Sequence, residues 1–302
     1  MSDIAYHIPV LLQESVDGLD IQKGGKYIDL TFGGGGHSKE ILSRLGRKGH
    51  LYGVDQDEDA IKNIPESKQF TFIKGNFRYI ANFMDFYNED GVDGILGDLG
   101  VSSHHFDEAE RGFSIRFEGP LDMRMNQKGE LTAEKVLNEY KEEELADLFY
   151  YYGEIKNAKK LAAKVCYRRQ AAPLKTINDF IEIAKECTPP KVENKYFSKA
   201  FQAIRIEVNQ ELEVLKDVLT ESLKILKPGG RLVVITYHSL EDRLVKNFFK
   251  TGNFEGKAEK DFYGAVTSPF ELVNRKVIVP NAEELERNTR SRSAKLRIAI
   301  KK

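Results

Sequence analysis

The sequence has little that would indicate a secreted, metal-dependent or membrane-spanning protein. Its two cysteines, Cys166 and Cys187, are too few for a disulfide framework or a four-cysteine metal site. The six histidines have neither H-E-x-x-H nor H-x₃₋₅-H spacing, so we expect no catalytic metal. No apolar run approaches the roughly 20 residues that a membrane span needs. The first residues lack a basic stretch followed by an apolar one, which argues against a secretory signal and favours a cytoplasmic protein.

An excess of charge of one sign is also missing. The chain has 46 Lys and Arg against 47 Asp and Glu, which gives a formal net charge of −1. Nucleic-acid-binding proteins are often strongly basic, so this average argues against such a partner. The local distribution argues the other way, because residues 156–175 and 287–302 contain many Lys and Arg and no acid. Each run is either a solvated face or a contact surface for RNA.

The first hundred residues alternate strand and helix patterns. Apolar runs closed by polar or glycine residues predict strands at residues 26–32, 51–55, 70–73 and 92–98. Helical spacing of apolar residues separates these runs, for example at Ile41, Leu42 and Leu45. Strands that alternate with helices indicate a parallel sheet with helices on both faces.

After Asp98 this alternation stops. Residues 99–130 are irregular, and residues 131–205 have helical patterns only. The α/β alternation resumes with a long helix at 208–226 and strand candidates at 231–237, 273–279 and 295–300. We therefore predict an α/β protein with a mostly parallel, Rossmann-like sheet and an all-helical subdomain inserted after the fourth strand. The expected division is a discontinuous sheet domain at 1–106 and 206–302, and an insertion at 107–205.

Four glycines, Gly33 to Gly36, close the first predicted strand. Glycine lets the backbone approach a ligand closely, and ligands of open α/β sheets bind beyond the carboxyl ends of the strands. Asp55 ends the second strand, where a carboxylate can bind ribose hydroxyls, and Phe77 follows the third, where a ring can cover adenine. The third glycine of a dinucleotide fingerprint is missing, which favours S-adenosylmethionine over a dinucleotide. A purely structural turn is the alternative.

Six stretches along the chain resemble one family, the RsmH (MraW) type of methyltransferase. They begin at His7 (HIPVLL), Asp29 (DLTFGGGGHS), Asp98 (DLGVSS), Arg111 (RGFS, with GPLDMRM from Gly119), Phe201 (FQAIRI, with VN from Val208) and His238 (HSLEDR, with RSRSAKLR from Arg290). GPLDMRM and HSLEDR are the most specific of them. The resemblance implies a Rossmann-like methyltransferase fold and the methylation of the N4 amino group of a cytidine in small-subunit (16S) ribosomal RNA, within the 30S subunit.

The resemblance also implies the cofactor contacts. Together with the turn residue Gly33, they fall on Gly35, Gly36, His37, Asp55, Phe77, Asp98 and His105. His105 stands where the family commonly has Gln, and Tyr237 stands where it usually has Phe. An imidazole can still donate one hydrogen bond, and Tyr keeps the aromatic ring.

Asp98 and His238 are the candidate catalytic residues. Cytosine N4 is a poor nucleophile because its lone pair is delocalised into the ring, so transfer needs close placement and an acceptor for the amino hydrogens. Asp98, at the end of the fourth strand, can orient the amino group and accept its proton. Alternatively it only caps a turn or contacts the cofactor. His238, after the fifth strand, either contacts the base or RNA or is a satisfied structural histidine.

The remaining candidates concern the RNA. A base inside folded RNA must leave its stack to enter a pocket, and its RNA needs basic contacts. Asp122 and Arg124 either line that pocket or pair with each other, and Asn209 opens a helix as a substrate contact or as a cap. The candidate RNA-binding residues of the first basic run are Lys159, Lys160, Arg168 and Arg169.

Other functions remain open from the residues alone. They are an amino methyltransferase that acts on another nucleic acid or a small molecule, a non-catalytic RNA-binding protein with a vestigial cofactor site, and an NAD-dependent oxidoreductase. The retained acids Asp29, Asp55 and Asp98 argue against a decayed site, and the missing third glycine argues against NAD.

Overall fold

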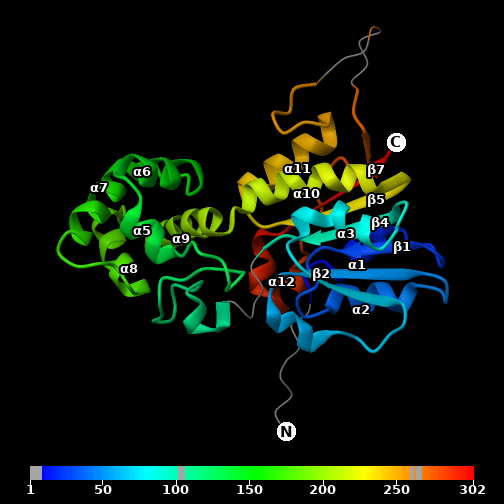
Figure 1. Ribbon diagram of the computed structural model, residues 1–302. Helices are drawn as coiled ribbons and strands as arrows, with labels where there is room; N and C mark the ends of the chain where they lie inside the picture. Colours follow the sequence, from blue (N-terminus) through cyan, green and yellow to red (C-terminus); the bar gives the residue numbers. More distant parts are fainter. Residues whose placement is uncertain (1–8, 101–105, 259–261, 263–266) are drawn as a thin grey trace. The chain divides into compact units, whose positions relative to one another are not determined.

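The computed structural model describes residues 9–100, 106–258, 262 and 267–302 (Figure 1). The chain divides into two compact units. The first combines Met1–Gly100 with Leu212–Lys302, and the second is Val101–Glu211. These boundaries lie a few residues from the expected ones. Among the described residues, no helix is long and apolar enough to cross a membrane.

The first unit is built on one seven-stranded sheet of described residues, in the order β3-β2-β1-β4-β5-β7-β6. β1 to β5 pair in parallel, while β7 runs antiparallel to both of its neighbours. This confirms the mostly parallel, Rossmann-like sheet. The strands are β1 (Lys26–Asp29), β2 (His50–Asp55), β3 (Phe70–Lys74), β4 (Val92–Asp98), β5 (Leu226–Thr236), β6 (Phe270–Leu272) and β7 (Lys295–Lys301).

Helices cover both faces of this sheet. Successive strand residues point to opposite faces, and accordingly Ile95 and Val234 belong to one buried apolar cluster while Leu96 and Val233 belong to another. Strands buried on both faces explain the continuous apolar runs in the sequence. The helical elements of this unit are α1 (Leu12–Leu19), α2 (Gly36–Arg44), η1 (Glu58–Asn63), η2 (Phe77–Tyr79), α3 (Ile80–Phe86), α10 (Glu211–Ile225), α11 (Ser239–Thr251), α12 (Ala282–Arg287) and η4 (Thr289–Ser293).

The second unit packs helices around a core of its own. Phe180 lies at the centre of an aromatic row, with ring centroids 5.9 Å from Phe149 and 5.6 Å from Phe201. A capping box formed by Thr176 and Asp179 begins α8, as the sequence spacing predicts. The regular elements described here are η3 (Ala109–Arg111), α5 (Ala133–Glu139), α6 (Glu142–Tyr151), α7 (Ala158–Arg169), α8 (Ile177–Cys187) and α9 (Glu193–Asn209).

Three element predictions are wrong. The expected helix at 208–226 is two helices, because Gln210 adopts a left-handed φ of 51° between α9 and α10. The fifth strand already begins at Leu226, where a register shift opposite β4 absorbs the Pro-Gly-Gly segment. The strand expected at 273–279 is not formed, and Ile278 makes only an isolated bridge to Leu296.

Candidate cofactor and acceptor site

Three neighbouring strands of the first unit each end at an aspartate. Asp29 ends β1, Asp55 ends β2 and Asp98 ends β4. Because these strands are adjacent and parallel, their carboxyl ends meet at one edge of the sheet. This is the edge at which open α/β sheets bind ligands.

The glycine-rich turn adopts a conformation that only glycine accommodates easily. Gly33 and Gly35 have φ of 47° and 73°, in the left-handed region. A Cβ on Gly36 would lie 2.1 Å from Cγ of Pro9. The N–H of Gly33 donates to Oδ2 of Asp55 at 2.8 Å, which ties the turn to the end of β2. The turn and the Asp55 carboxylate therefore form one preorganised corner.

Asp29 supports this corner from beneath. Its carboxylate is 1% exposed and accepts hydrogen bonds from Oγ of Ser38 at 2.7 Å and from the N–H of Thr31 at 3.1 Å. Burial raises the pKa of Asp29, and the hydrogen bonds from Ser38 and Thr31 oppose that rise. These contacts fix the start of α2 and show Asp29 as a structural residue.

Asp98 lies beside the turn with both carboxylate oxygens near polar side chains. Its Oδ1 accepts the hydroxyl of Tyr237 at 2.7 Å, and its Oδ2 lies 4.0 Å from Nδ1 of His37. Burial raises the pKa of Asp98 to about 6, although His37 and the Tyr237 hydroxyl both act to lower it. A carboxyl group with this pKa is mainly ionised at neutral pH and can still accept a proton.

His37 is buried at the start of α2. Its Nε2 lies 3.2 Å from the carbonyl oxygen of Val10, and a carbonyl can only accept, so we assign the hydrogen to Nε2. Nδ1 faces Asp98 and attracts its carboxylate when the imidazole is protonated at both nitrogens. The structure thus brings together Asp98, His37, Asp55 and the glycines that the sequence predicted as cofactor contacts.

Phe77 begins η2 directly after β3, on the same side of the sheet as the other strand ends. It is half-buried against the apolar core, and Asn76 caps its helix by accepting the N–H of Arg78 at 3.0 Å. Part of the ring remains available to a ligand. His105, the position that replaces the usual Gln, lies outside the described residues.

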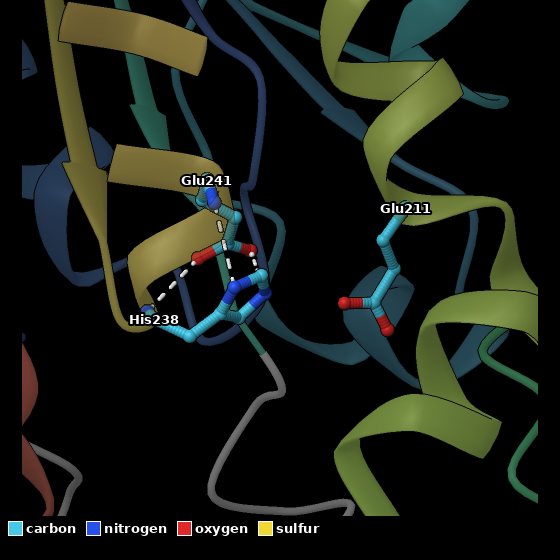
Figure 2. A group of neighbouring side chains, drawn as sticks. All are labelled: Glu211, His238 and Glu241. Carbon is cyan, nitrogen blue, oxygen red and sulfur yellow. Dashed lines mark hydrogen bonds and ion pairs between the residues drawn. The ribbon is translucent and has the colours of Figure 1, made fainter. Parts of the chain in front are cut away.

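His238 is the N-cap of α11. Its Nδ1 faces the N–H of Glu241 at 3.4 Å (Figure 2). Oε2 of Glu241 accepts the N–H of Tyr237 at 3.0 Å. Nε2 of His238 lies 3.2 Å from Oε1 of Glu241, and both side chains are buried. This capping box agrees with the structural alternative for His238. This capping role is not among the predictions from the sequence, although Glu stands at the third residue after His238, the spacing of such a box.

Asp122 and Arg124, in the second unit, pair with each other. Nη2 of Arg124 donates to Oδ2 of Asp122 at 2.6 Å and Nε donates to Oδ1 at 3.0 Å. Hydrogen bonding to Asp122 raises the pKa of Arg124. This bidentate pair corresponds to the pairing alternative of the sequence analysis.

Asn209 ends α9, so the prediction that it opens a helix is wrong. Its Oδ1 accepts the N–H of Met125 at 2.8 Å, and its Nδ2 donates to the carbonyls of Met123 at 2.8 Å and Arg205 at 2.9 Å. Met123 has a left-handed φ of 61°. Asn209 therefore holds the GPLDMRM segment against α9 by hydrogen bonds to its backbone.

The basic residues along α7 differ in their contacts, although they form one run in the sequence. Arg169 donates to the carbonyls of Leu137 and Tyr140, both at 2.7 Å, so it caps the end of α5. These two hydrogen bonds give the guanidinium a structural role, and its contact with RNA stays a prediction. Arg168 lies 3.5 Å from Glu186 and 3.8 Å from Glu182 of α8. Lys159 and Lys160 are exposed.

Basic residues of the second run also form ion pairs with an acid and a hydrogen bond to a backbone carbonyl. Lys295 and Arg297 of β7 both bind Asp242 of α11, at 3.2 and 2.8 Å. Lys301 donates to the carbonyl of Leu223 at 2.7 Å. These residues attach the strand to its neighbours.

Comparison with known proteins gives the same family along the whole chain. The profile of the MraW methylase family matches residues 4–302. Among similar proteins, the ribosomal RNA small subunit methyltransferase H of Phocaeicola vulgatus is 63% identical over 98% of both chains. Those of Parabacteroides distasonis, at 61% over 99% of this chain and 98% of its own, and Flavobacterium johnsoniae, at 57% over 98% of both, carry the same name. The chain belongs to the MraW methylase family, and its cofactor is S-adenosylmethionine, as the glycine-rich turn predicted.

Proposed function

We propose that this protein transfers the methyl group of S-adenosylmethionine to the N4 amino group of a cytidine in 16S ribosomal RNA, within the 30S subunit. The observation that carries this proposal is the Asp98 carboxylate, fixed by Tyr237 beside the glycine-rich turn. The family and the names of the similar proteins support a methylase that acts on small-subunit ribosomal RNA.

The corner formed by the turn and Asp55 suits the cofactor. Each oxygen of Asp55 accepts one backbone N–H, from Gly33 and from Asp57, both at 2.8 Å. A carboxylate oxygen has a further lone pair, so both oxygens can also accept ribose hydroxyls. The turn lets the backbone approach the rest of the ligand, and the half-buried ring of Phe77 offers a face to adenine. The bound cofactor supplies an electrophilic methyl group on a positively charged sulfur.

Asp98 performs the acceptor chemistry in this proposal. Tyr237 occupies Oδ1, and Oδ2 is directed toward His37 at 4.0 Å, which leaves lone pairs on the carboxylate for an amino hydrogen. A hydrogen bond from the N4 amino group to the carboxylate draws the nitrogen lone pair out of conjugation. The methyl carbon exchanges its bond to sulfur for a bond to N4, which leaves neutral S-adenosylhomocysteine, and the proton that N4 must lose goes to Asp98. With a pKa of about 6, Asp98 can be ionised before the transfer and protonated after it near neutral pH.

The RNA-binding surface that we propose lies at the start of α7. Three segments meet there, because Asn157 donates to the carbonyl of Cys187 at 2.7 Å and accepts the hydroxyl of Tyr196 at 3.2 Å. Lys156, Lys159 and Lys160 are exposed at this junction, and the positive end of the helix dipole adds to their attraction for phosphate.

The methylation assay tests the proposal directly. The protein is incubated with labelled S-adenosylmethionine and unmodified 16S RNA, bare or in 30S subunits, and the label is mapped by nuclease digestion and mass spectrometry. We expect label on the N4 amino group of a cytidine. Label on another base or on another class of RNA only would refute the substrate, and tight cofactor binding without any turnover would support the vestigial RNA-binding alternative. The Asp98→Asn variant should bind the cofactor and lose turnover.

The RNA-binding surface is tested with a charge-matched pair of variants. Lys159→Glu with Lys160→Glu should weaken RNA binding and reduce the salt dependence, d log K/d log[salt], by about 2, or about 1 for each phosphate that is no longer neutralised. The control is Lys246→Glu with Lys250→Glu on the exposed face of α11, which changes the net charge equally. If both pairs weaken RNA binding alike, only bulk charge matters and the proposed surface is wrong.

A further inference from the structure

Tyr237 reaches from one strand end to the next. It follows β5, whose Ile235 stands opposite Asp98 in the parallel pairing of β4 and β5. Its hydroxyl donates to Oδ1 of Asp98 at 2.7 Å. Its ring packs on Gly100, where an added Cβ would lie 2.8 Å from the ring carbon Cδ2, and Gly100 has a φ of 156° that other residues rarely adopt. The ring and the hydroxyl thus hold both the backbone after β4 and the carboxylate at its end.

The backbone of Tyr237 is anchored as firmly as its side chain. Its N–H donates to Oε2 of Glu241 at 3.0 Å, within the capping box of α11. The N–H of Leu99 donates to the carbonyl of Ile235 at 2.9 Å, which continues the strand pairing beyond Asp98. The hydroxyl therefore stands at a fixed point relative to the carboxylate, as a positioning group must.

We propose that Tyr237 is a positioning residue, whose hydroxyl holds the Asp98 carboxylate in its ionised form and in one orientation for the acceptor nitrogen. This inference rests on the proposed function, because it deepens the role given there to Asp98. The hydroxyl gives up no proton and touches neither the methyl group nor the base. A Phe at this position would keep the ring on Gly100 and remove only the donor.

The charged and titratable groups around Asp98 come from α2, β1 and α11 and from the residue after β5. The hydroxyl of Tyr237 and, when it is protonated, His37 of α2 stabilise the carboxylate, whereas Asp29 of β1 and Glu241 of α11 repel it. Burial and the nearby Asp98 hold the pKa of Tyr237 well above its ordinary value, so its hydroxyl remains a donor across the working pH range. Loss of that donor removes one of the groups that keep Asp98 ionised, and His37 at 4.0 Å is the more distant of the two.

The test is Tyr237→Phe, with two readouts. The first is the carboxyl ¹³C titration of Asp98 in protein labelled at aspartate, assigned by its disappearance in Asp98→Asn. We expect the midpoint to move up by about 1 pH unit, the scale of one charge-assisted hydrogen bond. The second is the pH profile of kcat/KM for RNA methylation. The acidic limb of the profile should move to higher pH by the same amount as the titration. The kcat/KM of the variant should therefore be about fivefold below that of the wild type at pH 6 and should approach it above pH 8.

Tyr52→Phe is the matched control. The hydroxyl of Tyr52 donates to a carboxylate oxygen of Glu89 at 2.6 Å in the same unit, so both variants remove one tyrosine–carboxylate hydrogen bond. The control should lose stability to a similar degree and leave the Asp98 titration and the pH profile unchanged. An unchanged Asp98 midpoint in Tyr237→Phe, or a deficit of equal size at every pH, would overturn the positioning role. If the wild-type protein methylates no RNA, the proposed function fails, and the ¹³C titration still decides the inference.

Discussion

Replacement of Asp98 by Asn should make the folded protein more stable at neutral pH while it abolishes turnover. Burial raises the pKa of Asp98 from its ordinary value of 3.8 to about 6 in the folded protein. One pKa unit corresponds to 1.36 kcal/mol, so ionisation of Asp98 is about 3 kcal/mol less favourable in the folded protein than in the unfolded chain. Asn carries no charge and avoids this penalty. Its carbonyl can still accept the Tyr237 hydroxyl, and its amide can donate toward His37.

The sign of this effect follows from proton binding. Between pH 3.8 and about 6 the folded protein holds the Asp98 proton more tightly than the unfolded chain does, so wild-type stability falls as the pH rises through that window. The advantage of Asn should therefore be about 1 kcal/mol at pH 4.5 and about 3 kcal/mol at pH 8. Stability that is given up at a charged site in return for activity is common in enzymes.

Urea unfolding at pH 4.5 and pH 8, followed by circular dichroism because the chain has no tryptophan, measures this difference. Asp93→Asn is the control on the same strand. Asp93 accepts the N–H of Lys26 at 2.8 Å and the ammonium of Lys227 at 3.0 Å, so its replacement should lower stability at pH 8 by about 1 kcal/mol. An Asp98→Asn variant that gains nothing at pH 8, or gains equally at both pH values, would refute the reasoning.

Two further variants test the corner formed by the glycine-rich turn and the hydrogen bonds by which Asn209 holds the GPLDMRM segment. Gly36→Ala should weaken binding of S-adenosylmethionine by about fivefold or more in calorimetry, because overpacking against Pro9 costs about 1–3 kcal/mol. Gly24→Ala, whose Cβ would meet nothing closer than 3.9 Å, should bind normally, and equal affinities of the two variants would count against a preorganised turn. Asn209→Ala should lower the free energy of unfolding by about 2–4 kcal/mol, because the N–H of Met125 and the carbonyl of Met123 lose their partner. The exposed Asn126→Ala, directly after that segment, should change the free energy of unfolding by less than about 0.5 kcal/mol. A similarly small change for Asn209→Ala would contradict the role of Asn209 in holding the segment.

The sequence predicts β1, β2 and β4 well because these strands are almost wholly buried and their apolar runs are closed by polar residues or glycine. The runs that end at Asp55 and Asp98 place two carboxylates at one edge of the sheet, whereas the first run, predicted over 26–32, has Asp29 inside it. Only local information is needed, since neighbouring parallel strands end at the same edge.

Features that depend on distant partners escape such reasoning. No Gly or Pro near Gln210 indicates the helix break in the sequence. Apolar residues continue there at helical spacing through Val208, Leu212 and Leu215. The break occurs because the two helices bury their apolar faces in the cores of different units. Arg169 looks like any other basic residue of its run until the fold places it beside the carbonyls that end α5.

The site residues divide in the same way. The glycines and Asp55 could be predicted because one turn and one strand end contain the whole signal. The contact between Tyr237 and Asp98 joins residues 139 positions apart, and only the pairing of β4 with β5 brings them together. The sequence singled out Tyr237 solely as a departure from the usual Phe, with no sign of what its hydroxyl does.

The place of β7 in the sheet has a consequence for folding during translation. β7 is formed by Lys295–Lys301, yet it lies between β5 and β6 and supplies the neighbour on which β5 depends. The helical unit is continuous in sequence, so all of it leaves the exit tunnel before β5, β6 and β7 do. At roughly 5–20 residues per second, the sheet must then wait several seconds for its inner strand. The sheet is therefore completed only once β7 has emerged, long after β1, β2 and β4 with the glycine-rich turn that they support.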